Sequence, residues 1–536
     1  MFQSVILEKE DAITQDPRGV VLTGDALRSL YALGLGKYIS SIGQGKGDAV
    51  VGRDEHAEGV TVHYLNRDQK SCQIQAGWLV GADGKRGIVR KHFLEPSAGI
   101  RQEVGIFEYD GTWIAANLKI TLPTPESHPD LALWAAGYDQ ESVFDLFWPQ
   151  NWHFCRPPGR PVACGRFGPL EDRLWRHEFA VPEWDDSMDA LSMFWDHLSP
   201  IITRNIEPSY GARPVEVTFP SDCIQVLRCR PFQFSHRVVN AWFANRTVLI
   251  GDAAHVFPPF GGQGVAGGVQ DAVGLAWRLA ILTKMGTLSS SITCRNSLLQ
   301  AWAAERRMGI DNSARLTRQN GELCNKEASF KGHLQLACVK IAQAFLNGLG
   351  MRLPLVEADS RGYSGCGRGT FLAEFGGGIK LGQIYVQVRV PNLPTLRIEL
   401  SDQTLRRAPT VLTLLVIQHT RCHEGQSLVD LRQLLSRSGV NSSILSDKSI
   451  VQFDPEGSSN IETGTGRWPV CRAAPTDLLA GYPLRLGYNP DQFLHRLGDS
   501  RARYGFKNQG NGTSATESEI SKLLASTMAP CHFPEG

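Results

Sequence analysis

The stretch RTVLIGDAAHVFPPFGGQGVAGGVQDAVGLAWRLA, residues 246–280, contains the signals that decide the fold. An apolar run at 247–250 ends at Gly251-Asp252, and a segment rich in glycine and proline leads from there into a helical pattern. A strand that ends in this way presents its carboxylate at the carboxyl end of a sheet, where α/β folds bind ligands. The stretch therefore predicts a strand, an acid that faces a ligand, and a helix that begins near Gly264.

The loop after Asp252 suits a flat ligand that accepts hydrogen bonds. Few side chains surround the backbone between Pro258 and Gly264, so a planar ring can approach it closely. The following helix points free N–H groups and its positive end at the same place, and a reduced isoalloxazine carries negative charge along its N1–C2=O edge. The alternative is that Asp252 caps a helix and the glycines turn the chain. The length of the combined pattern favours the flavin.

Composition limits the classes of protein that this chain can be. Its 536 residues suggest roughly two to four domains. Hydrophobic residues make up 42% of the chain, charged residues 20%, and the net charge is +1, which gives no pull toward nucleic acid or anionic membrane. The longest apolar run, 411–417, is far too short to span a bilayer and predicts a buried strand. We therefore expect neither nucleic acid nor a membrane span.

The start of the chain has no signal-peptide pattern, and no C-x-x-C pair or metal-ligand spacing occurs. We expect a cytoplasmic protein without a bound metal. Its twelve cysteines should be reduced and mostly buried.

Other segments carry weaker signals. A short buried strand should end at Glu8, and helices should continue from Gly264 to about residue 350. Apolar and polar residues alternate between 142 and 167, which is typical of antiparallel strands. The expected strands lie at residues 2–9, 60–65, 72–80 and 142–167.

At residues 246–280 the chain resembles the class A flavoprotein aromatic hydroxylases, especially their phenol hydroxylase-like branch. In that family the Gly-Asp aspartate binds the ribityl chain of FAD, a role that falls to Asp252. The family often has Met-Asn where this chain has Val265-Ala266. The family's loop along the flavin ring matches Pro259, Gly262, Gln263 and Gly264.

Two further segments extend the resemblance. The string GADGKRGIVR, residues 81–90, is similar to a family motif that touches the FAD pyrophosphate region and the nicotinamide coenzyme, and it assigns those contacts to Asp83 and Arg90. Family members often have Ser where Gly87 stands. By the same resemblance, Glu8 would bind the adenosine ribose and Arg18 would lie beside the cofactor. A plain Asp-Gly turn at Asp83 and a surface acid at Glu8 are the alternatives.

One expected unit does not precede Glu8. An acid that binds ribose normally follows a strand and a G-x-G-x-x-G turn by about twenty residues. Glu8 stands too near Met1 for both. The missing turn would supply N–H groups to the pyrophosphate, so we expect an incomplete Rossmann-like domain that binds FAD weakly.

The resemblance implies an α/β chain, α+β overall, in three parts. Residues 1–103 and 231–350 would form a discontinuous FAD-binding domain, and 104–230 an antiparallel-sheet domain for the substrate. Residues 371–525 would form a thioredoxin-like domain, redox-inactive without C-x-x-C, that contributes to a homodimer interface. Four aromatic residues would roof the substrate pocket, although each one singly is better explained as core: Phe144, Phe147, Trp152 and Phe154.

The implied activity is that of an FAD-dependent monooxygenase, which uses NAD(P)H and O₂ to hydroxylate a phenolic or other aromatic small molecule. Two alternatives stay open, an inactive remnant of the family and a flavin-dependent dehydrogenase or reductase. The patterns name no catalytic acid or base. His255 belongs to the motif around Asp252 and is expected to be structural.

Overall fold

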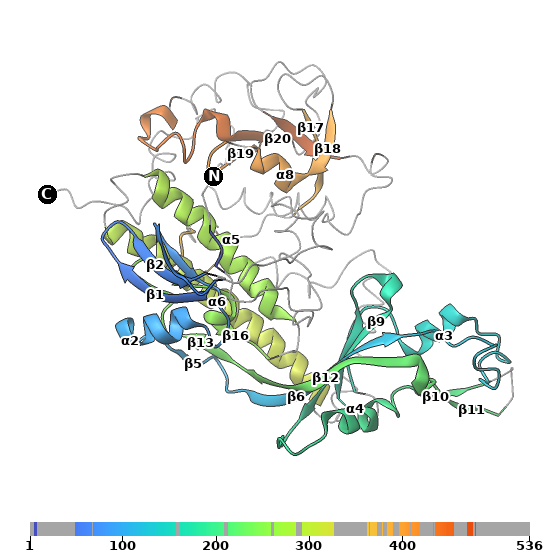
Figure 1. Cartoon of the computed structure of the whole chain (residues 1–536). Coiled ribbons are helices and arrows are strands. Elements are labelled where there is room, and N and C mark those ends of the chain that lie inside the picture. Colours follow the sequence, from blue (N-terminus) through green and yellow to red (C-terminus); the bar gives the residue numbers. More distant parts are fainter. Residues whose placement is uncertain are drawn as a thin grey trace.

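The computed structural model describes the larger part of the chain from Ala49 to Asn325 and a set of shorter segments on either side. The described residues are 5–7, 49–66, 68–156, 161–207, 213–258, 262–285, 292–325, 362–363, 365–371, 378, 383–389, 396–407, 409–417, 433, 435–454, 469–474 and 478. They form a mixed α/β structure with several sheets and two long helices (Figure 1).

The strand predicted after residue 246 is present and pairs with a strand from the beginning of the chain. Strand β15 (Thr247–Leu249) runs parallel to β4 (Leu79–Gly81), with Leu249 opposite Gly81. Strand β14 (Phe243–Ala244) adds an antiparallel hairpin to β15. Val248 and Leu249 are completely buried in a core that α5 and α6 share. This short sheet is the scaffold of the predicted acid at residue 252.

Next to it lies an antiparallel meander that was predicted in part. Strands β2 (Val60–Leu65) and β3 (Ser71–Ala76) pair as expected, and β1 (Ala49–Glu55), which no sequence signal had indicated, adds a third strand. The expected strand at 72–80 is wrong as a single element. It ends at Ala76, and β4 then begins a different sheet, because the chain bends at Gly77.

The antiparallel sheet predicted within residues 104–230 is confirmed. Its five strands follow the order β12-β6-β9-β8-β7, and the largest hydrophobic core lies against one of its faces. The strands are β6 (Asp110–Ile120), β7 (Trp152–Cys155), β8 (Val162–Phe167), β9 (Leu174–Val181) and β12 (Ile224–Ser235). Smaller strands flank it: β10 (Thr203–Ile206) pairs with β11 (Val215–Thr218), and β13 (Arg237–Val239) pairs with β5 (Gln102–Val104) and β16 (His255–Val256).

One stretch that was predicted as strand is a helix. Helix α3 (Gln140–Phe147) begins after Asp139, whose carboxylate accepts a hydrogen bond from Ser142 N at 2.7 Å. Phe144 and Phe147 lie on its inner side, in the core beneath the sheet, so they are core residues and do not roof a pocket. A cap residue and helical spacing outweigh the strand propensity of aromatic side chains here. Helix α4 (Ala190–Leu198) packs on the same face of the sheet.

Two long helices form a hairpin that packs against the β4–β15 sheet. Helix α5 (Gln263–Lys284) begins where it was predicted, and α6 (Ile292–Asn325) follows it. Of the described residues, only α5 is long and apolar enough to cross a membrane. Its Asp271 and Arg278 form buried ion pairs with α6, so the helix is packed as one half of the hairpin.

The C-terminal part folds around a mixed five-stranded sheet of order β18-β17-β21-β20-β19, which lies beside α5 (Figure 1). Ile444 packs against Ile281 and Leu282 of α5, and Asn441 Nδ2 donates a hydrogen bond to Lys284 O at 2.8 Å. The elements are β17 (Tyr385–Arg389), β18 (Arg397–Leu400), α8 (Ser401–Arg406), β19 (Leu414–Ile417), β20 (Ile450–Phe453) and β21 (Val470–Ala473). The run expected as a strand at 411–417 is therefore a strand over its second half.

Two further expectations need correction. Residues 5–7 are not a strand, and Val5 and Ile6 are 64% and 85% exposed, because no described strand pairs with them. Cys294, on α6, is disulfide-bonded, although the cysteines were expected to be reduced. The other described cysteines with an assigned state are free: Cys72, Cys155, Cys164, Cys223, Cys229, Cys366 and Cys471.

Candidate cofactor site

The parallel strands β4 and β15 bring two of the predicted site residues to one edge of the sheet. Ile250 N donates to Gly81 O at 3.0 Å, so the chains leave the sheet side by side. Asp83 follows two residues after Gly81, Asp252 follows three residues after Leu249, and both side chains are exposed. Parallel strands that end together create the edge at which α/β sheets bind ligands. Asp83 and Asp252 therefore lie at the same edge of the sheet.

Asp83 shapes its own loop. Its Oδ2 accepts a hydrogen bond from Val89 N at 2.9 Å, at the start of the π-helical turn η2 (Val89–Leu94), which continues into α2 (Glu95–Ala98). A Cβ atom on Gly87 would lie 2.1 Å from Asp83 Oδ1, so the glycine is required for this position of the carboxylate. The departure from the family's Ser at residue 87 therefore has a steric reason. One carboxylate oxygen thus holds the start of the π-helical turn, and a contact of Asp83 with a cofactor stays a prediction.

Arg90 joins the two loops of the site. Its guanidinium donates to Ala253 O at 3.2 Å and to Lys85 O at 2.5 Å, and the residue is 4% exposed. Burial lowers the pKa of Arg90, while Glu95 and Asp83 act in the opposite direction. In this position Arg90 holds the Asp83 loop against the turn that carries Asp252. Its contact with a cofactor stays a prediction.

The Gly251-Asp252 turn is held from behind by a buried acid. Gly251 has a φ of +58°, which favours glycine, and it opens the 3-10 turn η5 (Gly251–Ala253). Its N–H donates to Asp271 Oδ2 at 2.8 Å, and His255 Nε2 lies 2.7 Å from the same oxygen. Asp271 and His255 have no exposed surface. The expectation that His255 is structural is confirmed.

Arg306, on α6, completes this buried network. Its Nε donates to Asp271 Oδ1 at 2.5 Å, and its Nη2 donates to Gly267 O at 3.2 Å. Burial raises the pKa of Asp271, but His255 and Arg306 outweigh it, and the pKa lies below its usual value. Burial likewise lowers the pKa of Arg306, but Asp271 and Tyr363 reverse the shift. Both groups are therefore charged, and the ion pair fixes the turn on the helical hairpin.

Sequence reasoning missed Asp271 and Arg306. Asp271 stands in the quoted Gln-Asp-Ala string, so its place in the motif was visible, but nothing nearby in the sequence indicates its partner on another helix.

Glycines allow α5 to approach this turn. A Cβ on Gly267 would lie 2.9 Å from the His255 ring, and one on Gly268 would lie 3.4 Å from Gly251 Cα. Side chains at these positions would push the helix away from the turn. The close approach sets the N-terminus of α5 next to Asp252.

The first turn of α5 has the features expected of a flavin loop. Gly262 precedes the helix with a φ of +61°, no side chain caps the N-terminus, and the first turn contains no acid. A Cβ on Gly262 or Gly264 would meet no atom within 4 Å, so the backbone there borders open space. The N–H groups of Gln263 and Gly264 lie at the positive end of the helix. This donor set fits the electron-rich edge of a flavin.

Three predicted site residues, Glu8, Arg18 and Pro259, lie outside the described residues, and their roles stay predictions.

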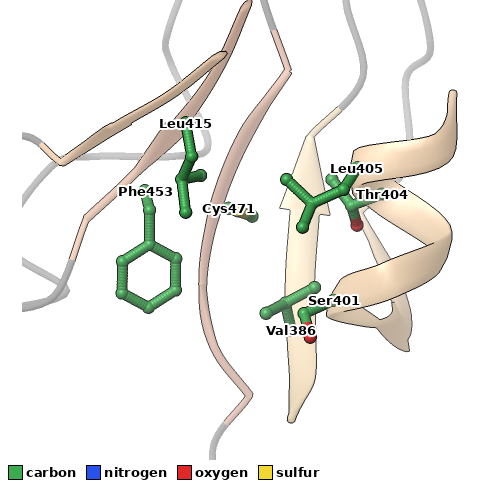
Figure 2. Close-up of a pocket in the computed structure, with 7 residues that line it drawn as sticks. All are labelled: Val386, Ser401, Thr404, Leu405, Leu415, Phe453 and Cys471. Carbon is green, nitrogen blue, oxygen red and sulfur yellow. The ribbon is translucent and has the colours of Figure 1, made fainter. Parts of the chain in front are cut away.

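A small cavity elsewhere in the molecule is not a ligand site. It measures about 10 Å³ and lies between α8 and the C-terminal sheet (Figure 2). This volume is at most that of one water molecule. Burial raises the pKa of Cys471, in its wall, to about 12, so the thiol stays protonated. The lining residues are Val386, Ser401, Thr404, Leu405, Leu415, Phe453 and Cys471.

Comparisons with known proteins also indicate an FAD-binding site in this part of the chain. Residues 42–308 match the family described as FAD binding domain. The 3-(3-hydroxy-phenyl)propionate/3-hydroxycinnamic acid hydroxylase of Burkholderia cenocepacia is 27% identical over 235 residues, 44% of this chain and 34% of the relative. The 6-methylpretetramide 4-monooxygenase of Streptomyces rimosus is 29% identical over 245 residues, 45% of this chain and 34% of the relative. The match thus spans about a third of these relatives' length.

Among solved structures, the anhydrotetracycline hydroxylase OxyS from Streptomyces rimosus aligns over 93% of both chains, with 18% identity and a TM-score of 0.49. Residues 42–308 include the Asp83 loop, the Asp252 turn and the start of α5, so the matched region is the one that forms the site. Residues 42–308 thus belong to the FAD binding domain family, and the relatives that match this chain are named as hydroxylases and monooxygenases.

Proposed function

We propose that this chain is an FAD-dependent monooxygenase that hydroxylates a phenolic or other aromatic small molecule with NAD(P)H and O₂. The observation that carries the proposal is the parallel pairing of β4 with β15, which sets Asp83, Asp252 and the N-terminus of α5 around one edge. The family match and the names of two relatives, a 3-(3-hydroxy-phenyl)propionate/3-hydroxycinnamic acid hydroxylase and a 6-methylpretetramide 4-monooxygenase, support the same reaction class.

Each residue of the edge has a separate task in this proposal. Asp252 accepts hydrogen bonds from the ribityl hydroxyls, and the N–H groups of Gln263 and Gly264 donate to the flavin's pyrimidine edge. Arg90 keeps the two loops in register, and Asp83 fixes the turn at Val89. Bound FAD would supply the redox chemistry and the activation of O₂, so the protein's part is to bind, orient and exclude water.

The substrate would lie on the face of the five-stranded sheet that does not contact α3 and α4. Trp113 and Ala163 are buried there, and further aromatic side chains surround them. Lys85 Nζ, in the cofactor loop, donates to Gln233 O on β12 at 3.0 Å, so this end of the sheet lies near the Asp83 loop. The surrounding aromatic residues are Tyr109, Trp152, Phe154 and Phe234.

The domain plan belongs to the same proposal. Residues 1–103 with 231–350 would bind FAD, 104–230 would bind substrate, and 371–525 would form a thioredoxin-like domain that contributes to a cytoplasmic homodimer. The mixed sheet, with β19, β20 and β21 parallel and β17 antiparallel to β21, supports the thioredoxin-like assignment.

Flavin absorbance of the purified chain tests the cofactor role of Asp252. We expect added FAD to bind, and Asp252→Ala to weaken its Kd by roughly tenfold to a hundredfold, because a hydrogen bond to a charged group is worth about 1.5–3 kcal/mol. The exposed Glu171→Ala is the control and should leave the Kd unchanged. Equal Kd values for both variants and the parent would remove Asp252 from the site.

Product analysis tests the reaction class. Oxidation of NAD(P)H with a hydroxylated aromatic product would support the monooxygenase. Oxidation without such a product would favour the dehydrogenase or reductase, and a colourless, inert chain would favour the inactive remnant.

A further inference from the structure

Three side chains with metal-binding atoms meet at one end of the five-stranded sheet. His128 lies in the connection between β6 and α3, and Asp222 and Cys223 lie in the 3-10 turn η4 (Ser221–Cys223) just before β12. Strands β6 and β12 pair there, with Ile120 opposite Ile224, so the two segments leave the sheet together. The cluster lies at the start of β12, whereas Gln233, which contacts Lys85 of the cofactor loop, lies near the end of that strand, and the proposed function does not use the cluster.

The donor atoms are spaced as ligands of one ion. His128 Nε2 lies 3.2 Å from each oxygen of Asp222 and 3.9 Å from Cys223 Sγ. The ligand atoms of all three lie within 4.8 Å of one another. Ordinary zinc bond lengths in a tetrahedron place nitrogen and oxygen ligands about 3.4 Å apart and nitrogen and sulfur ligands about 3.6 Å apart. The observed spacing therefore needs only a small adjustment around an ion.

The site is held in place before any ion binds. Ser127 Oγ hydrogen-bonds to His128 Nδ1 at 2.8 Å, which leaves Nε2 for a ligand bond. His128 O accepts from Trp134 Nε1 at 2.8 Å, and Cys223 O accepts from Thr121 N at 2.9 Å. A partner on the second ring nitrogen is the usual arrangement of metal-bound histidines.

An exposed ion pair explains less of this geometry. A surface His–Asp contact contributes about 0–1 kcal/mol and requires neither a thiol nor a fixed imidazole. Cys223 is 5% exposed, and its sulfur lies on the buried side of the His128–Asp222 pair, 3.9 Å from His128 Nε2. Nitrogen, oxygen and sulfur ligands together are typical of zinc, and soft thiolate ligands disfavour magnesium and calcium. Three protein ligands leave a fourth position for water.

We propose that His128, Asp222 and Cys223 bind one Zn²⁺ ion, or a similar borderline divalent cation, with solvent as the fourth ligand. The ion would fasten the β6–α3 connection to the start of β12 and so brace the end of the sheet. This role is independent of FAD.

Titration of the whole chain with Co²⁺ under reducing conditions tests the proposal, because a cobalt–thiolate bond gives a near-ultraviolet charge-transfer band. We expect a band at one Co²⁺ per chain that Zn²⁺ displaces. Cys223→Ala should abolish the band. The control is Cys229→Ala, on β12, whose thiol donates a hydrogen bond to Ala190 O, and it should leave the band unchanged.

Ser127→Ala separates a built site from a chance cluster. Loss of the hydrogen bond to Nδ1 should weaken Co²⁺ binding by roughly tenfold to a hundredfold, the usual effect of removing such a partner. Circular dichroism of each variant checks the fold. A charge-transfer band that survives Cys223→Ala in a folded chain would overturn the proposal, and so would the absence of any band in the parent chain.

Discussion

At the scale of single residues, the buried acid Asp271 decides whether the Asp252 turn keeps its shape. It receives Gly251 N, His255 and Arg306 at once, in a place that no water reaches. Removing one partner of a buried ion pair leaves the other charge uncompensated, which costs about 3–5 kcal/mol. We expect Asp271→Ala to lower the free energy of unfolding by that amount, measured by urea denaturation.

A control for Asp271 lies on the same hairpin, in a partly exposed ion pair. Asp311 pairs with Arg307 at 3.0 Å within α6, one turn apart. Ion pairs of this i,i+4 kind contribute about 0.3–0.5 kcal/mol. Asp311→Ala should therefore change stability little. An equal loss in both variants would mean that the buried network does not support the turn.

Cys155 is a second residue whose surroundings set its chemistry. A hydrogen bond from Cys164 lowers the pKa of Cys155 to about 7, burial opposes this shift, and Arg204 adds to it. Since the thiolate is the nucleophile, iodoacetamide should alkylate Cys155 with a rate that rises through about pH 7. Alkylation of each cysteine is followed by mass spectrometry of its peptide. Burial raises the pKa of Cys229 to about 11, so this thiol should react slowly and serves as the internal control. A Cys155 rate that follows Cys229 at every pH would contradict the prediction.

At the scale of elements, β9 contains a histidine that makes the stability of the five-stranded sheet depend on pH. His177 is 1% exposed, and its Nε2 lies 3.0 Å from His197 Nδ1 on α4. Burial, with a smaller contribution from His197, lowers the pKa of His177 well below 6.5. Below about pH 6.5 the imidazole of His177 therefore binds a proton in the unfolded chain but not in the folded chain. Stability is therefore complete above about pH 6.5 and declines as the pH falls below it.

The measurement is the midpoint of urea denaturation at pH 7.5 and pH 5.5. His177→Gln should lower stability at both values but reduce the difference between them, and the exposed His92→Gln should keep the parental difference. If the difference in the His177 variant matched that of the parent, another group would cause the pH dependence.

The elements also show where sequence reasoning succeeds and where it stops. The Gly-Asp turn was predictable because its motif is long and local, and β15 and the start of α5 followed from it. Helix α3 was missed because its cap, Asp139, precedes the stretch at 142–167, in which alternating apolar and polar residues indicated strands. The contacts of Asp271 with Arg306 and of His128 with Cys223 join distant segments. A local sequence pattern cannot predict such contacts, because they form only when distant segments pack together.

At the scale of the whole molecule, Ile444 fastens the C-terminal part to α5. The side chain is completely buried and packs against Ile281, Leu282 and Leu298. Truncation of a buried isoleucine costs about 2–5 kcal/mol. We expect Ile444→Ala to speed proteolytic cleavage between the α6 hairpin and the C-terminal sheet. Val388→Ala, in the core of that sheet, should instead speed cleavage within it. The same cleavage pattern in both variants would argue against Ile444 as the fastening contact.

The pairing of β4 with β15 has a consequence for how the chain reaches its final shape. Thr247 must find Leu79 across the whole five-stranded sheet, which lies between them in sequence, whereas α5 and α6 are neighbours along the chain. Contacts between distant segments form late because closing a long loop costs entropy before any contact compensates for it. The helical hairpin can thus assemble early, while the edge that carries Asp83 and Asp252 waits until the inserted sheet has folded. A slow step in the folding of that sheet would therefore delay the formation of the cofactor edge.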